Sequence, residues 1–239
     1  MPEEGIQLFR HDEILSFDEI AGFTEVAVSN GVTKVRLTGG EPLVRKGVIL
    51  LVSMLSEING IEDLSMTTNG TLLKQYAKQL RDAGLHRVNI SLDTIDPEKF
   101  RIVTRTGDIN DVFEGINAAK SAGLLPVKIN CVIKDSKEEE EARAVAVFCK
   151  DNDLEIRYIR QMDLIRGHFS VVDGGTGGDC SRCNRLRLTS NGKLKPCLFN
   201  KIEFDIRKLG FEKAIHQAAE SKPECGSRNE TGSFYNIGG

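Results

Sequence analysis

Short runs of β-branched and apolar residues alternate with helical patterns through the first two thirds of this 239-residue sequence. Five strands are predicted there, at residues 32–38, 64–68, 87–92, 127–133 and 155–161. Helices are predicted at residues 16–29, 47–58, 72–83, 110–122 and 137–150. A repeated strand–helix unit is typical of a parallel sheet with helices packed outside it. The sequence therefore predicts an α/β fold that is either doubly wound or barrel-like.

The pattern changes after residue 162. Glycines crowd residues 167–178, and a group of cysteines follows them. Because glycine-rich segments mark loops and boundaries, we predict a partial barrel over residues 1–162 and a C-terminal extension over residues 163–239.

The cysteines of the extension have the spacing of a metal or cluster site. Cys180 and Cys183 form a Cys-x2-Cys pair, and a strand that returns after the turn at residues 190–192 is predicted to bring Cys197 back to them. Three thiolates leave one metal position open for water or substrate, whereas four favour structural zinc. Cys225 keeps the zinc alternative open, because it is a fourth ligand, a free thiol or a residue without a function.

Polar residues end every predicted strand, where parallel βα folds bind their ligands. Gly39 and Gly40 follow the first strand and would let a ligand approach the backbone, and Glu41 offers a carboxylate to an amine or a ribose. An ordinary strand-to-helix turn explains the same residues. Arg36 and Lys128 stand inside strands, which indicates either an anion such as a phosphate on that face or outward salt bridges.

Composition excludes several classes of protein. The net charge of −3 argues against general DNA or RNA binding, and no run of about 18 apolar residues occurs. Six cysteines, three of them clustered, suit a reducing compartment better than a disulfide framework. We therefore expect a cytoplasmic protein that has no membrane segment.

Several motifs together resemble the radical S-adenosylmethionine (SAM) GTP 3′,8-cyclases of molybdenum-cofactor biosynthesis, the MoaA family. They are residues 35–43 (VRLTGGEPL), 67–70 (TTNG), 89–93 (NISLD), the cysteine trio with residues 184–187 (NRLR), and the terminal residues 237–239 (IGG). The resemblance implies an incomplete (βα)6 TIM-like barrel with a C-terminal extension that binds a 4Fe–4S cluster. It also implies an enzyme, a lyase that converts GTP to (8S)-3′,8-cyclo-7,8-dihydroguanosine 5′-triphosphate.

The same resemblance implies roles for particular residues. A first group lines the SAM pocket, a second contacts GTP, and a third ligates the 4Fe–4S cluster. These groups are Gly39, Gly40, Glu41, Ser91 and Met162 for SAM, Arg36, Thr67, Lys128, Arg185 and Arg187 for GTP, and Cys180, Cys183 and Cys197 for the cluster. The implied partners are a reductant such as flavodoxin and the cyclic pyranopterin monophosphate synthase that acts next, and a homodimer is left open.

The sequence departs from the family at its start. The family's Cys-x3-Cys-x2-Cys motif, which holds a second 4Fe–4S cluster, is absent from the printed residues. Its last cysteine precedes a Met-Pro pair in the family, and this sequence begins Met1-Pro2. We expect the motif and a first barrel strand to be encoded upstream. As printed, the chain is expected to be inactive in SAM cleavage and to leave a sheet edge open beside Val35.

A second departure is the interval from Met162 to Cys180, which is shorter than in typical members of the family. It covers the roof of the expected substrate site. Three alternatives therefore stay open: a related radical SAM enzyme with another substrate, an Fe–S or zinc binding protein without catalysis, and a plain βα phosphate-binding enzyme.

Overall fold

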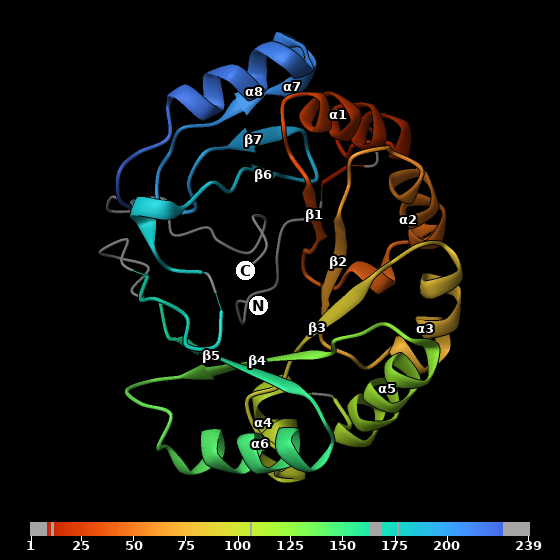
Figure 1. Cartoon of the computed structure of the whole chain (residues 1–239), viewed down its shortest axis with the longest axis vertical. Helices are drawn as coiled ribbons and strands as arrows, with labels where there is room; N and C mark the ends of the chain where they lie inside the picture. Colours follow the sequence, from red (N-terminus) through yellow and green to blue (C-terminus); the bar gives the residue numbers. More distant parts are fainter. Residues whose placement is uncertain (1–8, 11, 106, 163–168, 176, 227–239) are drawn as a thin grey trace.

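A curved parallel sheet forms the centre of the computed structural model, which describes residues 9–10, 12–105, 107–162, 169–175 and 177–226. Its strands follow one another in the order in which they occur in the chain, as Figure 1 shows. They are β1 (Lys34–Leu37), β2 (Asp63–Thr68), β3 (Arg87–Ser91), β4 (Lys128–Ile133) and β5 (Glu155–Arg160). Both the α/β fold and the five strands predicted from the sequence are confirmed.

Helices cover the outer side of this sheet (Figure 1). They are α1 (Phe17–Ser29), α2 (Val48–Ser56), α3 (Leu73–Asp82), α4 (Pro97–Thr104), α5 (Ile109–Ala122) and α6 (Glu140–Asp151). The sequence analysis did not identify α4. The signal was present, because Asp96 accepts hydrogen bonds from the backbone N–H groups of Glu98 and Lys99, and Pro97 occupies the first helical position.

Alternation along the strands gives the sheet an apolar outer face. Every second residue of the three central strands is buried against the helices and belongs to one continuous core. The fully buried members include Leu64, Met66, Val88, Ile90, Ile129 and Cys131. Because strand side chains alternate between faces, the residues between these positions point to the inner side of the curved sheet.

The C-terminal extension forms a small antiparallel sheet and two helices. The elements are β6 (Arg187–Leu188), β7 (Lys193–Lys195), β8 (Phe204–Asp205), α7 (Ile206–Leu209) and α8 (Phe211–Glu220), preceded by a short 3-10 turn, η2 (Cys180–Arg182). A second 3-10 turn, η1 (Pro42–Val44), follows β1 in the barrel. β6 pairs with β7 around a turn in which Gly192 has a φ of +81°. The hairpin predicted between the cysteines is therefore confirmed.

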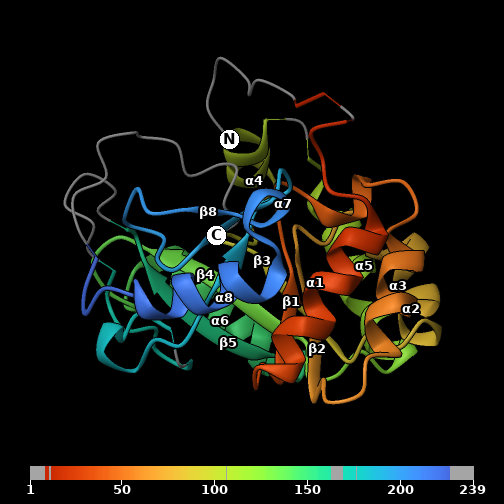
Figure 2. The same cartoon turned by 90° about the horizontal axis from the view of Figure 1, so that it is seen from above.

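The extension packs against the first helix of the barrel. α8 lies beside α1 in both views (Figure 1, Figure 2), and the rings of Phe23 and Phe211 meet edge to face with centroids 6.0 Å apart. Arg207 adds a two-pronged ion pair, in which Nε lies 2.6 Å from Oε1 of Glu19 and Nη2 lies 2.9 Å from Oε2. Residues on both sides of position 163 thus share one core, and the domain boundary near that residue stays a prediction.

Two further features bear on the sequence analysis. Among the described residues, β1 stands at one end of the parallel sheet and pairs only with β2. No helix in the described part of the chain is long and apolar enough to cross a membrane.

The Glu19–Arg207 pair predicts a pH-dependent contribution to stability. The hydrogen bond from Arg207 is the main reason that the pKa of Glu19 falls to about 2, although burial opposes the shift. A carboxylate whose pKa is lower in the folded state stabilises the protein above its unfolded pKa, near 4.3, and loses that contribution as the pH falls towards 2.

We expect Glu19→Gln to lower the free energy of unfolding in urea by about 1 kcal/mol at pH 7, since both side chains are partly exposed and screened by solvent. The difference from wild type should shrink between pH 5 and pH 2. Glu25→Gln, an exposed change on the same helix, is the control. A deficit that stayed constant across this pH range would contradict the assignment to the ion pair.

Candidate functional site

The inner face of the sheet is polar, and three of the predicted substrate residues lie on it. Residues in register on parallel strands point to the same face. Arg36 is in register with Ser65, which is in register with Arg87. Thr67, Asn89 and Lys128 form the next row. The structure therefore brings Arg36, Thr67 and Lys128 together on one side.

One arginine of this face has a carboxylate partner. Arg87 donates from Nε and Nη2 to the two carboxylate oxygens of Asp63, at 2.9 Å and 2.6 Å. Burial alone would raise the pKa of Asp63, but the Arg87 hydrogen bonds and the nearby charges of Arg87 and Arg36 outweigh it and lower that pKa. The negative charge of Asp63 is therefore paired directly with Arg87.

The other guanidinium groups form a cluster with an excess of positive charge. Burial, followed by repulsion from Arg185, Arg87 and Arg157, lowers the pKa of Arg36 to about 10. The pKa of Arg157 is lowered by burial and then by the charge of Arg87, and the pKa of Arg187 is lowered by burial and then by the charge of Arg185. Three strands and the extension therefore direct like charges into one space, which is an environment for an anion.

Unpaired polar atoms support that interpretation. Within the described residues, three buried side-chain atoms lack a hydrogen-bond partner: Nε of Arg157 and both amide atoms of Asn200. An unpaired buried N–H costs about 1–3 kcal/mol. A bound phosphate oxygen would satisfy such a donor, because a guanidinium group presents its N–H groups in the geometry of an oxyanion.

Lys128 has a partner on the same face. Its Nζ lies 2.5 Å from Oε2 of Glu155, and only 17 % of its side chain is exposed. The ion pair expected as one of the two interpretations is therefore present, but on the inner polar face and not on the outside. An anion bound by Lys128 stays a prediction.

The turns that follow the strands are fixed by one carboxylate. Glu41 accepts hydrogen bonds from the hydroxyl of Thr68 at 2.8 Å, from the backbone N–H of Asn69 at 2.7 Å and from that of Leu43 at 3.1 Å. Its two oxygens thereby join the turn after β1 to the turn after β2. A direct contact of Glu41 with SAM stays a prediction.

The remaining predicted SAM residues lie at this end of the sheet. Apart from adjoining residues, no atom of the described part of the chain lies within 4 Å of the positions where side chains would start on Gly39 or Gly40. Ser91 is exposed at the end of β3. Met162 packs against Leu198 and Phe199 of the extension. The roles of these residues in binding SAM stay predictions.

The cysteines lie around the base of the β6–β7 hairpin. Cys183 and Cys197 are both close enough to Arg187 to stabilise its charge. The thiol of Cys197 accepts a hydrogen bond from the backbone N–H of Phe199 at 3.4 Å. Burial opposes ionisation of Cys183, but the N–H of Arg185 and the charge of Lys222 outweigh it and lower the pKa of Cys183.

These donors fit an iron–sulfur cluster in chemistry but are not preassembled. All three thiols are free and half-buried, and hydrogen bonds and positive charge at sulfur favour thiolate ligands. Among the described residues, no three His, Cys, Asp or Glu side chains stand in metal-binding geometry. Ligation by Cys180, Cys183 and Cys197 therefore stays a prediction. Cys225 is exposed.

Glycines of the short segment before the cysteines contact the arginine cluster. A side chain on Gly175 would meet Cδ and Nε of Arg157 at 3.5 Å and 3.6 Å, and one on Gly177 would meet Nη2 of Arg185 at 3.1 Å. Bare backbone thus lies against both guanidinium groups. This segment lies beside the arginine cluster. It belongs to the shortened interval between Met162 and Cys180, which was expected to cover the substrate site.

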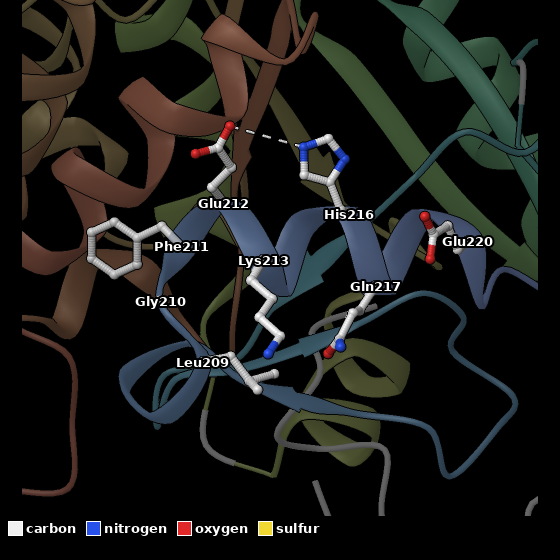
Figure 3. A pocket seen from close by; sticks show the side chains of 8 residues that line it. All are labelled: Leu209, Gly210, Phe211, Glu212, Lys213, His216, Gln217 and Glu220. Atoms are coloured by element: carbon white, nitrogen blue, oxygen red, sulfur yellow. Dashed lines mark ion pairs between the residues drawn. The ribbon is translucent and has the colours of Figure 1, made fainter.

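A hollow of the surface lies away from these residues. It measures about 620 Å³ and runs along the exposed side of α8, where His216 lies 4.0 Å from Glu212, as Figure 3 shows. It contains none of the site residues predicted from the sequence.

Sequence reasoning missed Arg87 and Arg157. Arg157 stands between Ile156 and Tyr158 in a predicted strand, which is the same signal that identified Arg36. Arg87 is the first residue of its strand, where a charged residue is common. Only the register of β3 with β2 shows that its side chain lies on the inner face.

Two family models match the chain. The Radical SAM superfamily model covers residues 3–149, and the Molybdenum Cofactor Synthesis C model covers residues 127–224. Among curated relatives, the GTP 3′,8-cyclase of Thermodesulfovibrio yellowstonii is 42% identical over 255 residues, an alignment that covers 87% of this chain and 79% of the relative. The GTP 3′,8-cyclase of Moorella thermoacetica is 40% identical, with 87% and 78% covered.

Solved structures agree on the fold. SuiB of Streptococcus suis bound to S-adenosylmethionine superposes on 90% of this chain with a TM-score of 0.65 at 16% identity. Methylornithine synthase (PylB) superposes on 66% with a TM-score of 0.52 at 18% identity. The chain spans 60% and 46% of the lengths of these two proteins. Identities this low support the fold alone.

The unpaired Nε of Arg157 gives a prediction about stability without ligand. Arg157→Met keeps most of the aliphatic side chain and removes both the orphaned donor and one repelling charge. We expect the free energy of unfolding to rise by about 1 kcal/mol, while the affinity for inorganic triphosphate falls roughly ten-fold. Urea unfolding and calorimetry measure the two effects. Arg160→Met, an exposed change on the same strand, should alter neither, and a destabilised Arg157→Met would refute the prediction.

Proposed function

This chain belongs to the radical SAM superfamily, and we propose that it is a GTP 3′,8-cyclase in which the inner arginine cluster binds the triphosphate of GTP. The observation that carries the proposal is the group of clustered arginines that form no carboxylate ion pair among the described residues, above all Arg157, whose Nε is buried and unpaired. The relatives named GTP 3′,8-cyclase, at up to 42% identity, support the choice of GTP.

The triphosphate would contact residues from both units of the chain. Arg36, Lys128 and Arg157 approach it from the sheet, and Arg185 and Arg187 approach it from the extension. A triphosphate carries about four negative charges at neutral pH, so it would relieve the mutual repulsion that lowers the pKa of Arg36. Thr67, on the same face, would donate its hydroxyl group to the ligand.

The base of the nucleotide would face the cysteine centre. Cys180, Cys183 and Cys197 would hold a 4Fe–4S cluster, which supplies an open iron position for a nitrogen or oxygen ligand. SAM would lie against the bare backbone of Gly39 and Gly40, near Ser91 and Met162, and the turn carrying those glycines is held by Glu41. The ribose of GTP would then lie between the two ligand regions.

In the reaction, this chain's residues would bind, orient and shield the reactants. Fixing the triphosphate at one end and the base at the other aligns the ribose C3′ with C8 of guanine, the two atoms that become joined. The sheet on one side and the C-terminal extension on the other would exclude water and competing quenchers while a radical exists. The printed sequence contains no Cys-x3-Cys-x2-Cys motif, so none of its residues is assigned to SAM cleavage.

The wider setting follows from this proposal. The chain would act in the cytoplasm, take an electron from a reductant such as flavodoxin, and pass its product to a cyclic pyranopterin monophosphate synthase. A homodimer remains one form in which it could act.

Arg185 and Arg187 provide a test of the substrate. A bidentate contact between arginine and phosphate in a partly enclosed site contributes about 1.5–3 kcal/mol. We therefore expect Arg185→Ala and Arg187→Ala each to weaken GTP binding roughly ten- to a hundred-fold, with Lys in either place restoring only part. Arg182→Ala, an exposed change two residues after Cys180, is the control. Changes under about two-fold in both variants, measured by calorimetry, would refute the triphosphate assignment.

Metal content tests the cysteine centre. After anaerobic reconstitution, we expect iron and acid-labile sulfide in a ratio near one, lost on Cys183→Ala and retained on Cys225→Ala. The exposure of Cys225 supports this contrast. Tightly bound zinc that disappears in Cys225→Ala would instead support a structural zinc site.

A further inference from the structure

Lys222 lies two residues beyond the end of α8, and its side chain reaches back to the β6–β7 hairpin. Its Nζ donates hydrogen bonds to the backbone carbonyl oxygens of Arg185 and Pro196, both at 2.7 Å. Arg185 belongs to the segment that enters β6, and Pro196 to the segment that leaves β7. One ammonium group therefore joins the two segments of the hairpin.

This bridge stands where the backbone ladder ends. The last registered pair of β6 and β7 is Arg187 with Lys195, and the segments beyond it lead to the cysteines. Pro196 directly precedes Cys197, and Arg185 lies two residues after Cys183. Lys222 thus links the two segments beyond the last backbone pair of the hairpin, where Cys183 and Cys197 lie close by in the chain.

The positive charge of Lys222 lies close to other cations. Lys222 is half-buried beside Arg185 and Arg187, and no carboxylate ion pair to it is present among the described residues. Three cations held together repel one another unless anions lie between them. Thiolates at Cys183 and Cys197, and a cluster bound to them, would supply the missing negative charge at this place.

We propose that Lys222 is the positioning residue of the cysteine centre, fixing the separation of the segments that carry Cys183 and Cys197 and placing a positive charge beside the bound cluster. The inference rests on the proposed 4Fe–4S site for its second half only. Its first half concerns the hairpin itself and holds in protein without iron.

Three variants of the full chain test it. Lys222→Met keeps most of the side-chain volume and removes both the charge and the donors, Lys222→Arg keeps both, and Lys213→Met removes an exposed lysine of α8. In iron-free protein, amide hydrogen exchange over residues 186–196 should be about ten-fold faster in Lys222→Met. It should be close to wild type in the other two. Exchange in β2 and β3 reports whether the fold is intact.

The same variants are then reconstituted with iron and sulfide. A nearby cation favours the more negative, reduced state of a cluster, so its loss makes the reduction potential more negative. We expect this shift in Lys222→Met and its rescue in Lys222→Arg, both measured by redox titration of the cluster's spectroscopic signal. Loss of iron to a chelator should be about ten-fold faster in Lys222→Met.

The outcomes separate this inference from the proposed function. Wild-type exchange in Lys222→Met, or equal acceleration in Lys222→Arg, would overturn the bridging role, the second because packing alone would then explain it. Unchanged potentials in all variants would overturn the electrostatic role. If wild-type protein binds no iron, the proposed centre fails and the electrostatic role fails with it, while hydrogen exchange still decides whether Lys222 holds the hairpin.

Discussion

Arg36, Arg87 and Arg157 project from three strands into one space, and Arg185 joins them from the extension. Among the described residues, Arg87 is the arginine of this group that donates hydrogen bonds to a carboxylate, that of Asp63. Partial burial and repulsion from neighbouring arginines lower the pKa values of Arg36 and Arg157, so these groups repel one another when no anion lies between them. The rest of the molecule can be understood as the framework that holds these groups near each other until an anion binds.

That framework is built from contacts between neighbouring turns. Glu41 joins the ends of β1 and β2, and Met162 packs the end of the barrel against Leu198 and Phe199 of the extension. The glycine segment presses bare backbone against Arg157 and Arg185. The contact of the glycine segment limits the freedom of these two guanidinium groups to move into water, as long cationic side chains usually do.

The sequence was sufficient for the parallel strands, for most of the helices that cover them and for part of the site. Alternation of β-branched runs with helical patterns located the five strands, and charges inside strands identified Arg36 and Lys128. Arg157 carried the same signal and was missed. Arg87 could not be found in this way, because its importance depends on register with β2, and register is a long-range property. The bridge from Lys222 to the hairpin is equally invisible, since no local pattern relates residues 26 and 37 positions apart.

The contact between α1 and α8 has a consequence for how the protein is made. Glu19 and Arg207 are separated by 188 positions, so the first helix cannot reach this partner until Arg207 has left the ribosome. The barrel strands have neighbours nearby in the chain and can assemble during synthesis, whereas the part of α1 that packs against α8, including Phe23, stays uncovered until then. During that delay the nascent chain would be most exposed to chaperones and to aggregation, and a ribosomal pause late in the message would prolong it.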